Sequence, residues 1–198
     1  MNERRTIMSL IPAFEIGVWN AWTLQVFFFL TLIVPNSLMS KEGKKRTKRA
    51  TQSVPFGRTH KILAYSTHVL IMPFTIIYSI FLPLKIGTAW LYVGLAIFIL
   101  SSVISVITSV NFATTPLDGP VTKGVFRISR NPIYLSGFLL YIGIGIATAS
   151  WVILLCAILW IVLFHIVLPS EEYFLLEKYG DSYREYMNKT PRWIGFPK

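Results

Sequence analysis

Four long apolar segments, separated by stretches that hold most of the charge, limit what this chain can fold into. They are residues 11–34, 62–84, 89–110 and 133–168. A helix needs roughly 20 apolar residues to cross the hydrocarbon core of a bilayer. A β-barrel would instead show weak alternation of apolar and polar residues. The pattern therefore predicts an all-helical, polytopic membrane protein.

The overall composition agrees with a membrane protein. Hydrophobic residues make up 54% of the 198 residues and charged residues only 14%, and the mean hydropathy is +0.57. A soluble domain is typically about 25% charged. The single cysteine, Cys156, lies inside an apolar segment, so it cannot form an intrachain disulfide and is expected to act as a small apolar filler.

The fourth apolar segment is expected to fold as two helices. It has 36 residues and is interrupted near 147–150, whereas two full spans and a turn would need about 40 or more. We expect two short helices in a hairpin, which brings the total to five transmembrane helices. Proline should end the first span at Pro35 and kink the second at Pro73.

A C-terminal helical tail, residues 170–198, is expected after the last span. Ser170 can cap the start of a helix, and Glu171 and Glu172 would then lie at its positive end. Gly180 is a typical end for that helix, and Asp181 can start a second short helix. The chain is thus predicted to divide into a three-helix membrane region, 1–110, and a cofactor-binding region, 111–198.

The basic residues predict the topology. The net charge is +10, and eight basic residues lie between the first two spans: Lys41, Lys44, Lys45, Arg46, Lys48, Arg49, Arg58 and Lys61. Under the positive-inside rule this loop, 35–61, is cytoplasmic. Five spans then place the N-terminus outside, and the tail and the polar segment 118–134 on the cytoplasmic side. Because these charges lie in loops between spans, we expect contact with lipid headgroups and no binding of nucleic acid.

Several kinds of active site are excluded by the residues present. The sequence has no Cys/His metal cluster, no Gly-x-Ser-x-Gly elbow and no phosphate-binding glycine loop. His60 and His68 fall roughly on one helical face, but they lack the closer ligands that a metal needs. No metal is therefore expected.

Two polar segments, 118–134 and 169–172, flank the last apolar hairpin. Because the two ends of a hairpin meet, Arg130 and Asn131 should lie near His165 and Glu171. An arginine, an amide, a carboxylate and the free N–H groups of a helix start suit a zwitterionic nucleoside cofactor. The simpler interpretation also stands: Arg130 as an inside-positive marker, and Glu171 with Glu172 as a favourable first helical turn.

The residues of both segments also follow the motifs of a known family. The segment 121–134, VTKGVFRISRNPIY, resembles the cofactor motif of the isoprenylcysteine carboxyl methyltransferases and their phospholipid methyltransferase relatives. In the tail, Glu171-Glu172-x-x-Leu175, Tyr179-Gly180-Asp181-x-Tyr183-x-x-Tyr186 and Pro191-Arg192 resemble further elements of the same family. The resemblance covers about residues 111–197.

The resemblance implies an integral membrane enzyme that uses S-adenosyl-L-methionine to methylate a lipophilic or lipidated acceptor, either a prenylcysteine-like carboxylate or a lipid amine. By position in the motifs, the cofactor contacts it implies are Asn111, Asp118, Gly119, Pro120, Val121, Phe126, Asn131, Pro132, Ile133, Tyr134 and Glu171. We add His165 because of its expected place at the meeting helix ends. The expected catalytic residues are Arg130, His165 and Glu171.

Two departures from the family pattern bear on the acceptor. Asn131 stands where isoprenylcysteine enzymes usually have His, and Val167 stands where they have a substrate-contacting Arg. Asn also occurs at the position of Asn131 among relatives, so it is Val167 that weakens the case for a prenylcysteine carboxylate. Two other functions stay open: an NADPH-dependent reductase of the sterol type, and a non-catalytic lipid-binding or accessory membrane protein.

Overall fold

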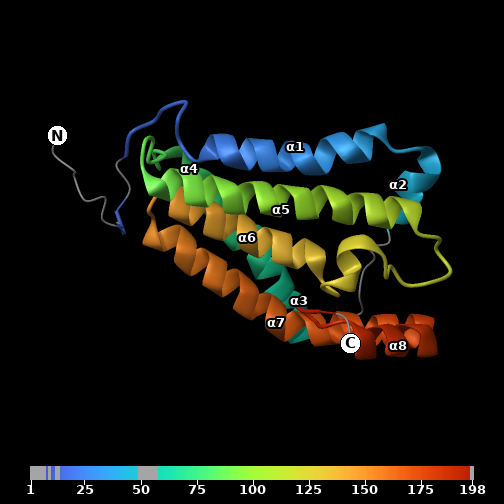
Figure 1. The fold of residues 1–198 in the computed structure, drawn as a ribbon. Helices are drawn as coiled ribbons and strands as arrows, with labels where there is room; N and C mark the ends of the chain where they lie inside the picture. The colour runs from blue at the N-terminus through green and yellow to red at the C-terminus, as the bar shows by residue number, and fades with distance from the viewer. Residues whose placement is uncertain (1–7, 9, 12–13, 49–57, 197–198) are drawn as a thin grey trace.

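The structure, a computed structural model, describes residues 8, 10–11, 14–48 and 58–196, and these fold into helices without any strand beyond isolated bridges such as that of Asn20 with Pro83. Arg4, Arg5, Arg49 and Lys198 lie outside the described residues. The helices are α1 (Trp22–Leu38), α2 (Lys41–Thr47), α3 (Arg58–Ser66), the π-helical turn η2 (Thr67–Ile71), α4 (Met72–Ile80), α5 (Ala89–Thr114), the 3-10 turn η3 (Gly124–Arg127), α6 (Pro132–Ala147), α7 (Trp151–Tyr179) and α8 (Asp181–Lys189). The all-helical prediction is confirmed (Figure 1).

Three of the described helices are long and apolar enough to cross a membrane: the continuous segment Arg58–Ile80, α5 and α7. The helices α1 and α6 have only 17 and 16 residues. At 1.5 Å per residue each is about 25 Å long, less than the roughly 30 Å of a hydrocarbon core. The protein is thus an integral membrane protein, while the predicted count of five spans is not confirmed. The predicted division into regions at residue 110 also stays a prediction.

The first apolar segment is helical over only part of its length. Residues 14–21 are not helical, because the backbone there is bonded to the α4–α5 connection: the Ala21 N–H donates to the Leu82 carbonyl at 2.8 Å, and Asn20 forms a bridge with Pro83. The predicted end at Pro35 was wrong, since α1 continues through this proline to Leu38. Pro35 lies in the last turn of α1, so the helix loses one backbone bond there, the one to the Thr31 carbonyl, and ends within three residues.

The second apolar segment contains a π-helical turn, η2, just before Pro73, and the predicted kink at Pro73 stays a prediction. Two side chains at this turn contact the Ala64 carbonyl: the Thr67 hydroxyl donates to it at 2.6 Å, and the His68 Nδ1 lies 3.0 Å from it. His68 is thereby accounted for as part of the helix.

Close backbone contact joins α5 to α6. A Cβ added at Gly94 would lie 2.4 Å from the Ala147 nitrogen, and one added at Gly143 would lie 2.8 Å from the Phe98 nitrogen. Gly137 of α6 likewise lies against the Trp160 ring of α7. Small residues thus let these helices approach closely, which is how membrane helices commonly associate.

The helix α7 differs from the prediction in length. We expected it to end near Leu168 and a new helix to start at Ser170. Instead, α7 runs without a break through Pro169 to Tyr179, so it has 29 residues, and Glu171 and Glu172 lie within it. The two glutamates are therefore held by side-chain partners and not by the N-terminus of a helix. The break at 147–150, the end of the helix at Gly180 and the start of α8 at Asp181 are confirmed.

The polar and basic elements gather at one end of the bundle. Helix α2, the segment 115–131 and helix α8 all lie at the end opposite the α6–α7 turn (Figure 1). Contacts support this view: Gly43 of α2 packs against Ala113 near the end of α5, and Tyr186 of α8 bonds to Phe126. We call this end the polar end.

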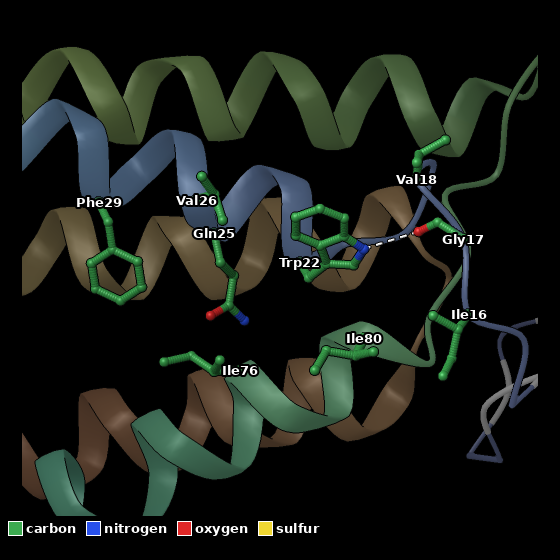
Figure 2. Close-up of a pocket in the computed structure, with 9 residues that line it drawn as sticks. All are labelled: Ile16, Gly17, Val18, Trp22, Gln25, Val26, Phe29, Ile76 and Ile80. Carbon is green, nitrogen blue, oxygen red and sulfur yellow. Dashed lines mark hydrogen bonds between the residues drawn. The ribbon is translucent and has the colours of Figure 1, made fainter.

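At the other end, an apolar groove of about 530 Å³ opens between α1 and α4 (Figure 2). Its lining comes from residues 16–29 together with Ile76 and Ile80, and it contains no ionisable side chain. The Gln25 side chain, its most polar member, donates to the Thr75 carbonyl at 2.9 Å. The groove therefore offers apolar contact and no group for acid–base chemistry.

Candidate functional site

The two ends of the α6–α7 hairpin meet, as the sequence predicted. The Tyr134 hydroxyl of α6 donates to Glu171 Oε1 of α7 at 2.7 Å. Asn131, which immediately precedes α6, has its Nδ2 3.4 Å from Glu172 Oε1. Residues about 40 positions apart are thus joined by direct hydrogen bonds. We call this group, Asn131, Tyr134, Glu171 and Glu172, the hairpin site.

Glu172 is the most enclosed carboxylate of the hairpin site, with its side chain only 3% exposed. Arg192 binds both of its oxygens, with Nε 3.1 Å from Oε1 and Nη2 2.7 Å from Oε2. Arg130 adds a second guanidinium, with Nη2 3.3 Å from Oε1. Two cations therefore compensate one buried anion, which removes the large cost of burying an unpaired charge. The hydrogen bonds to Glu172 raise the pKa of the Arg192 guanidinium.

Arg130 was predicted to be catalytic, and the structure places it in this ion cluster. Its side chain is 10% exposed, and its Nη1 also reaches the Met187 carbonyl at 3.5 Å. Its Nε is buried without a hydrogen-bond partner among the described residues. The contacts of the Arg130 guanidinium are thus with Glu172 and with α8, which favours a role in holding the site together.

Glu171 differs from Glu172 because one of its carboxylate oxygens accepts no hydrogen bond from the described residues. Its Oε1 accepts from Tyr134, and no other hydrogen bond to this carboxylate is formed by the described residues. The Tyr134 ring in turn lies against Phe164, with 4.2 Å between ring centroids. The site therefore offers an acceptor oxygen beside a wall of aromatic rings, an arrangement suited to a ligand with a cationic or hydrogen-donating group.

The segment after α8 closes over the hairpin site, and we call residues 190–196 the C-terminal strap. The Pro191 carbonyl accepts from the Arg130 N–H at 3.0 Å, and the Arg192 carbonyl accepts from the Ser129 hydroxyl at 3.3 Å. The Gly195 N–H donates to the Ile128 carbonyl at 3.2 Å. The strap is thus bonded along its length to residues 128–131.

His165 was predicted at the meeting helix ends, and it lies there on the exposed side. Its Nδ1 accepts from Trp193 Nε1 at 3.1 Å, and the two rings are nearly parallel with centroids 6.4 Å apart. No contact among the described residues joins it to Glu171. A neutral His165 already uses its one free lone pair on Trp193, so it could take up a proton only by giving up this bond.

The segment between α5 and α6 contains the other predicted contacts. Asn111, at 7% exposure, donates from Nδ2 to the Lys123 carbonyl at 3.0 Å. Gly124 has φ +60°, and a Cβ there would lie 2.3 Å from this Asn111 nitrogen. The glycine of the motif is thus required both by its backbone conformation and by its neighbour. Asn111 of α5 thus anchors the segment between α5 and α6 through its bond to Lys123.

Val121 and Phe126 are buried against α8. They pack with Tyr183 and Tyr186, and the Tyr186 hydroxyl donates to the Phe126 carbonyl at 2.7 Å. Burial raises the pKa of both phenols, so they stay neutral. Phe126 therefore belongs to the buried cluster that packs α8 against the segment between α5 and α6.

The remaining predicted residues lie at the two ends of this segment. Asp118 is exposed, and Gly119 and Pro120 are partly buried. No hydrogen bond or ion pair described in the structure joins Asp118 or Pro120 to Glu171. Pro132 is the first residue of α6 and is buried, and Ile133 follows it partly buried. Asn131 does not cap this helix with its side chain, so the first-turn N–H groups keep their capacity to bind an anion.

Three residues of the site were missed in the prediction: Glu172, Arg192 and Trp193. The paired glutamates and the Pro191-Arg192 dipeptide were visible as motif elements, so the resemblance could have indicated the first two. Trp193 carries no comparable signal. Within the described residues no group of three His, Cys, Asp or Glu side chains could hold a metal ion.

Comparison with known proteins adds to this geometry. A family model described as phospholipid methyltransferase matches residues 84–182, which is half of the chain. The match includes α5, the segment 115–131, α6 and α7 with both glutamates, and it ends before the C-terminal strap. No curated protein matches the chain. The family is one of membrane methyltransferases, and this chain belongs to the phospholipid methyltransferase family.

Proposed function

We propose that this protein transfers a methyl group from S-adenosyl-L-methionine to a lipophilic acceptor in the bilayer. The observation that carries the proposal is the pairing of Tyr134 with Glu171 inside the family-matched region. It puts a carboxylate with a spare oxygen at the start of α6, where the cofactor motif ends. Glu172, paired with Arg130 and Arg192, already joins the two ends of the hairpin. A hairpin with only a structural role would not need a second carboxylate, Glu171, beside it.

The residues present fit a zwitterionic nucleoside cofactor. The uncapped first turn of α6 offers N–H groups for its carboxylate. Asn131 and Glu171 offer acceptor oxygens for hydroxyl or ammonium groups. The aromatic rings of Tyr134 and Phe164 offer an apolar wall. When bound, the cofactor supplies an activated methyl group on a sulfonium that leaves as a neutral thioether.

The chain's own contribution to the reaction is mainly alignment. Holding two reactants in line can supply much of a rate enhancement without acid–base help. An amine acceptor, however, must lose a proton before it can attack. We assign the uptake of this proton to the free oxygen of Glu171, since His165 is engaged by Trp193.

The position of Val167 favours an amine over a carboxylate as the acceptor. Val167 is only 1% exposed and lies on the core side of α7. It therefore provides no cation where an isoprenylcysteine-type enzyme would hold its substrate carboxylate. A phospholipid with an amine headgroup fits both the family and the Glu171 carboxylate, which has no cationic partner among the described residues, and its acyl chains would stay in the bilayer because nothing favours their transfer to water.

We also propose that the polar end faces the cytoplasm. Helix α2 carries Lys41, Lys44 and Lys45 on its surface at this end, and the positive-inside rule assigns such clusters to the cytoplasmic side. The hairpin site would then open toward cytosolic cofactor. Accessibility labelling of a cysteine placed at Ser182 in intact and in opened cells would check this orientation.

The deciding experiment is methyl transfer by the purified protein in lipid nanodiscs. Radiolabelled S-adenosyl-L-methionine is supplied with phospholipids that carry a primary amine, a methylated amine or no amine. We expect label in the amine lipids and a loss of about 100-fold or more in kcat for E171Q. E177Q, an exposed glutamate on the same helix, is the matched control and should behave as the wild type. Absence of transfer to every lipid, together with tight binding of NADPH, would favour the reductase alternative.

A further inference from the structure

The chemistry around Asn131 fixes which way its amide points. Its Nδ2 lies 3.4 Å from Glu172 Oε1 and 3.2 Å from the Arg192 carbonyl oxygen. Carboxylate and carbonyl oxygens both accept hydrogen bonds, so the nitrogen of the amide, and not its oxygen, must face them. Both amide protons are directed at this pair of acceptors.

The amide oxygen of Asn131 consequently faces away from Glu172. Asn131 occupies the position before α6 where an asparagine oxygen ordinarily accepts from the first-turn N–H groups, but it forms no such bond here. The buried polar side-chain atoms without a partner among the described residues are Ser105 Oγ, Arg130 Nε and Ser150 Oγ. Asn131 Oδ1 is not one of them, and it is therefore an accessible acceptor with no partner described.

We propose that Glu172 is a positioning residue that holds the Asn131 amide so that Oδ1 accepts a hydrogen bond from an N–H or O–H donor of the adenosyl cofactor. This inference rests on the proposed function and goes beyond it by giving Glu172 a role in ligand selection. If the amide turned over, its N–H groups would face the ligand donor and its oxygen would face the Glu172 carboxylate. Both contacts would be repulsive, so the buried carboxylate selects one orientation.

Binding of four ligands to the full-length protein in nanodiscs tests the inference. They are S-adenosylhomocysteine and three analogues that each lack one donor: the N6,N6-dimethyladenine, the 2′-deoxyribose and the desamino compounds. The wild type should bind one of the three analogues about tenfold more weakly, or weaker still, than S-adenosylhomocysteine, because that analogue lacks the donor for the Asn131 oxygen. In E172Q the glutamine can present its own N–H₂ group to Asn131, so the Asn131 amide is no longer held in one orientation. The difference in affinity between the two ligands should then shrink to about twofold or less.

The double variant E172Q/N131D separates positioning from structural support. An aspartate presents an oxygen in whichever direction it turns, so the preference for the donor-bearing ligand should return. E177Q on the same helix is the control and should keep the wild-type preference. Should E172Q fail to fold, Glu172→Asp takes its place, because the shorter carboxylate no longer reaches the amide.

Three results would overturn the inference. The wild type could bind all three analogues as tightly as S-adenosylhomocysteine, or the Glu172 variant could keep the full wild-type preference. The Glu172 variant could also lose affinity equally for all four ligands, without recovery in the double variant that carries N131D. The last result would make Glu172 a structural residue only. A wild type that binds none of the four ligands would instead contradict the proposed function itself.

Discussion

Glu172 and Arg192 lie twenty positions apart in the chain, and their side chains meet in a two-point contact with Nη2 2.7 Å from Oε2 and Nε 3.1 Å from Oε1. The contact fastens the C-terminal strap to α7. Because Asn131 and Arg130 also contact Glu172, a single carboxylate links three parts of the chain that the family resemblance treats as separate motifs.

The first prediction concerns the strength of this link. The variant R192M removes the guanidinium and leaves the buried Glu172 with Arg130 alone. Breaking a buried pair typically costs 3–5 kcal/mol, and since the Arg192 side chain is 29% exposed we expect about 3 kcal/mol, at the low end. Thermal unfolding in detergent micelles measures the loss.

The control for this prediction is K189A, which removes an exposed ion pair with Glu185. Exposed pairs contribute about 0–1 kcal/mol, so K189A should unfold close to the wild-type temperature. Equal destabilisation by the two variants would show that the Glu172 cluster does not hold the strap.

The second prediction concerns the hydroxyl of Tyr134. The variant Y134F keeps the ring against Phe164 and removes the only hydrogen bond that the described residues donate to the Glu171 carboxylate. A hydrogen bond to a charged group is worth about 1.5–3 kcal/mol, so we expect kcat/KM for methyl transfer to fall by about 10- to 100-fold. Thermal stability should change by less than for R192M. A variant with wild-type turnover would remove Tyr134 from the proposed site.

The third prediction tests the close contact of α5 with α6. The variant G94A places a methyl group 2.4 Å from the Ala147 nitrogen and 2.6 Å from the Gly143 carbonyl oxygen. Both are backbone atoms, so the helices must move apart, at a cost of about 1–3 kcal/mol or more. The unfolding temperature should fall clearly. G119A is the comparison, because a Cβ there meets nothing within 4 Å.

The fourth prediction concerns alkaline pH. Burial raises the pKa of the Tyr183 and Tyr186 phenols above their usual value of about 10. Their contribution to folding is therefore complete below pH about 10 and is lost as the pH rises toward the folded-state values. Phenolate absorbance should show a late phase that disappears in Y183F/Y186F. A late phase of unchanged size in that variant would assign it to other tyrosines.

Much of the helical framework follows from local sequence. Apolar runs too long for a buried strand predict membrane helices, the interruption at 147–150 predicts a hairpin, and Gly180 and Asp181 mark the boundary between α7 and α8. The hairpin in turn brings Asn131 toward the glutamates of α7, because the two ends of a hairpin must meet. These conclusions need only chain order and helix geometry.

Other boundaries could not be found locally. Ser170 and Pro169 form a plausible helix start by themselves, yet α7 continues through them. The buried face of the helix decides the outcome there: Glu172 is surrounded by Arg130 and Arg192, and Glu171 is bonded to Tyr134. Likewise, α1 starts late because residues 20–21 bond to the α4–α5 connection.

By itself, the sequence determined the class of protein, the polar end of the bundle and the motifs that meet there, since hydropathy, charge and spacing are properties of neighbouring residues. Only the tertiary structure decided that Glu171 keeps a free oxygen while Glu172 is neutralised, and that the strap returns over Asn131. The physical reason is that two adjacent, identical side chains point in different directions on a helix. Their surroundings therefore depend on which distant segments pack against each face.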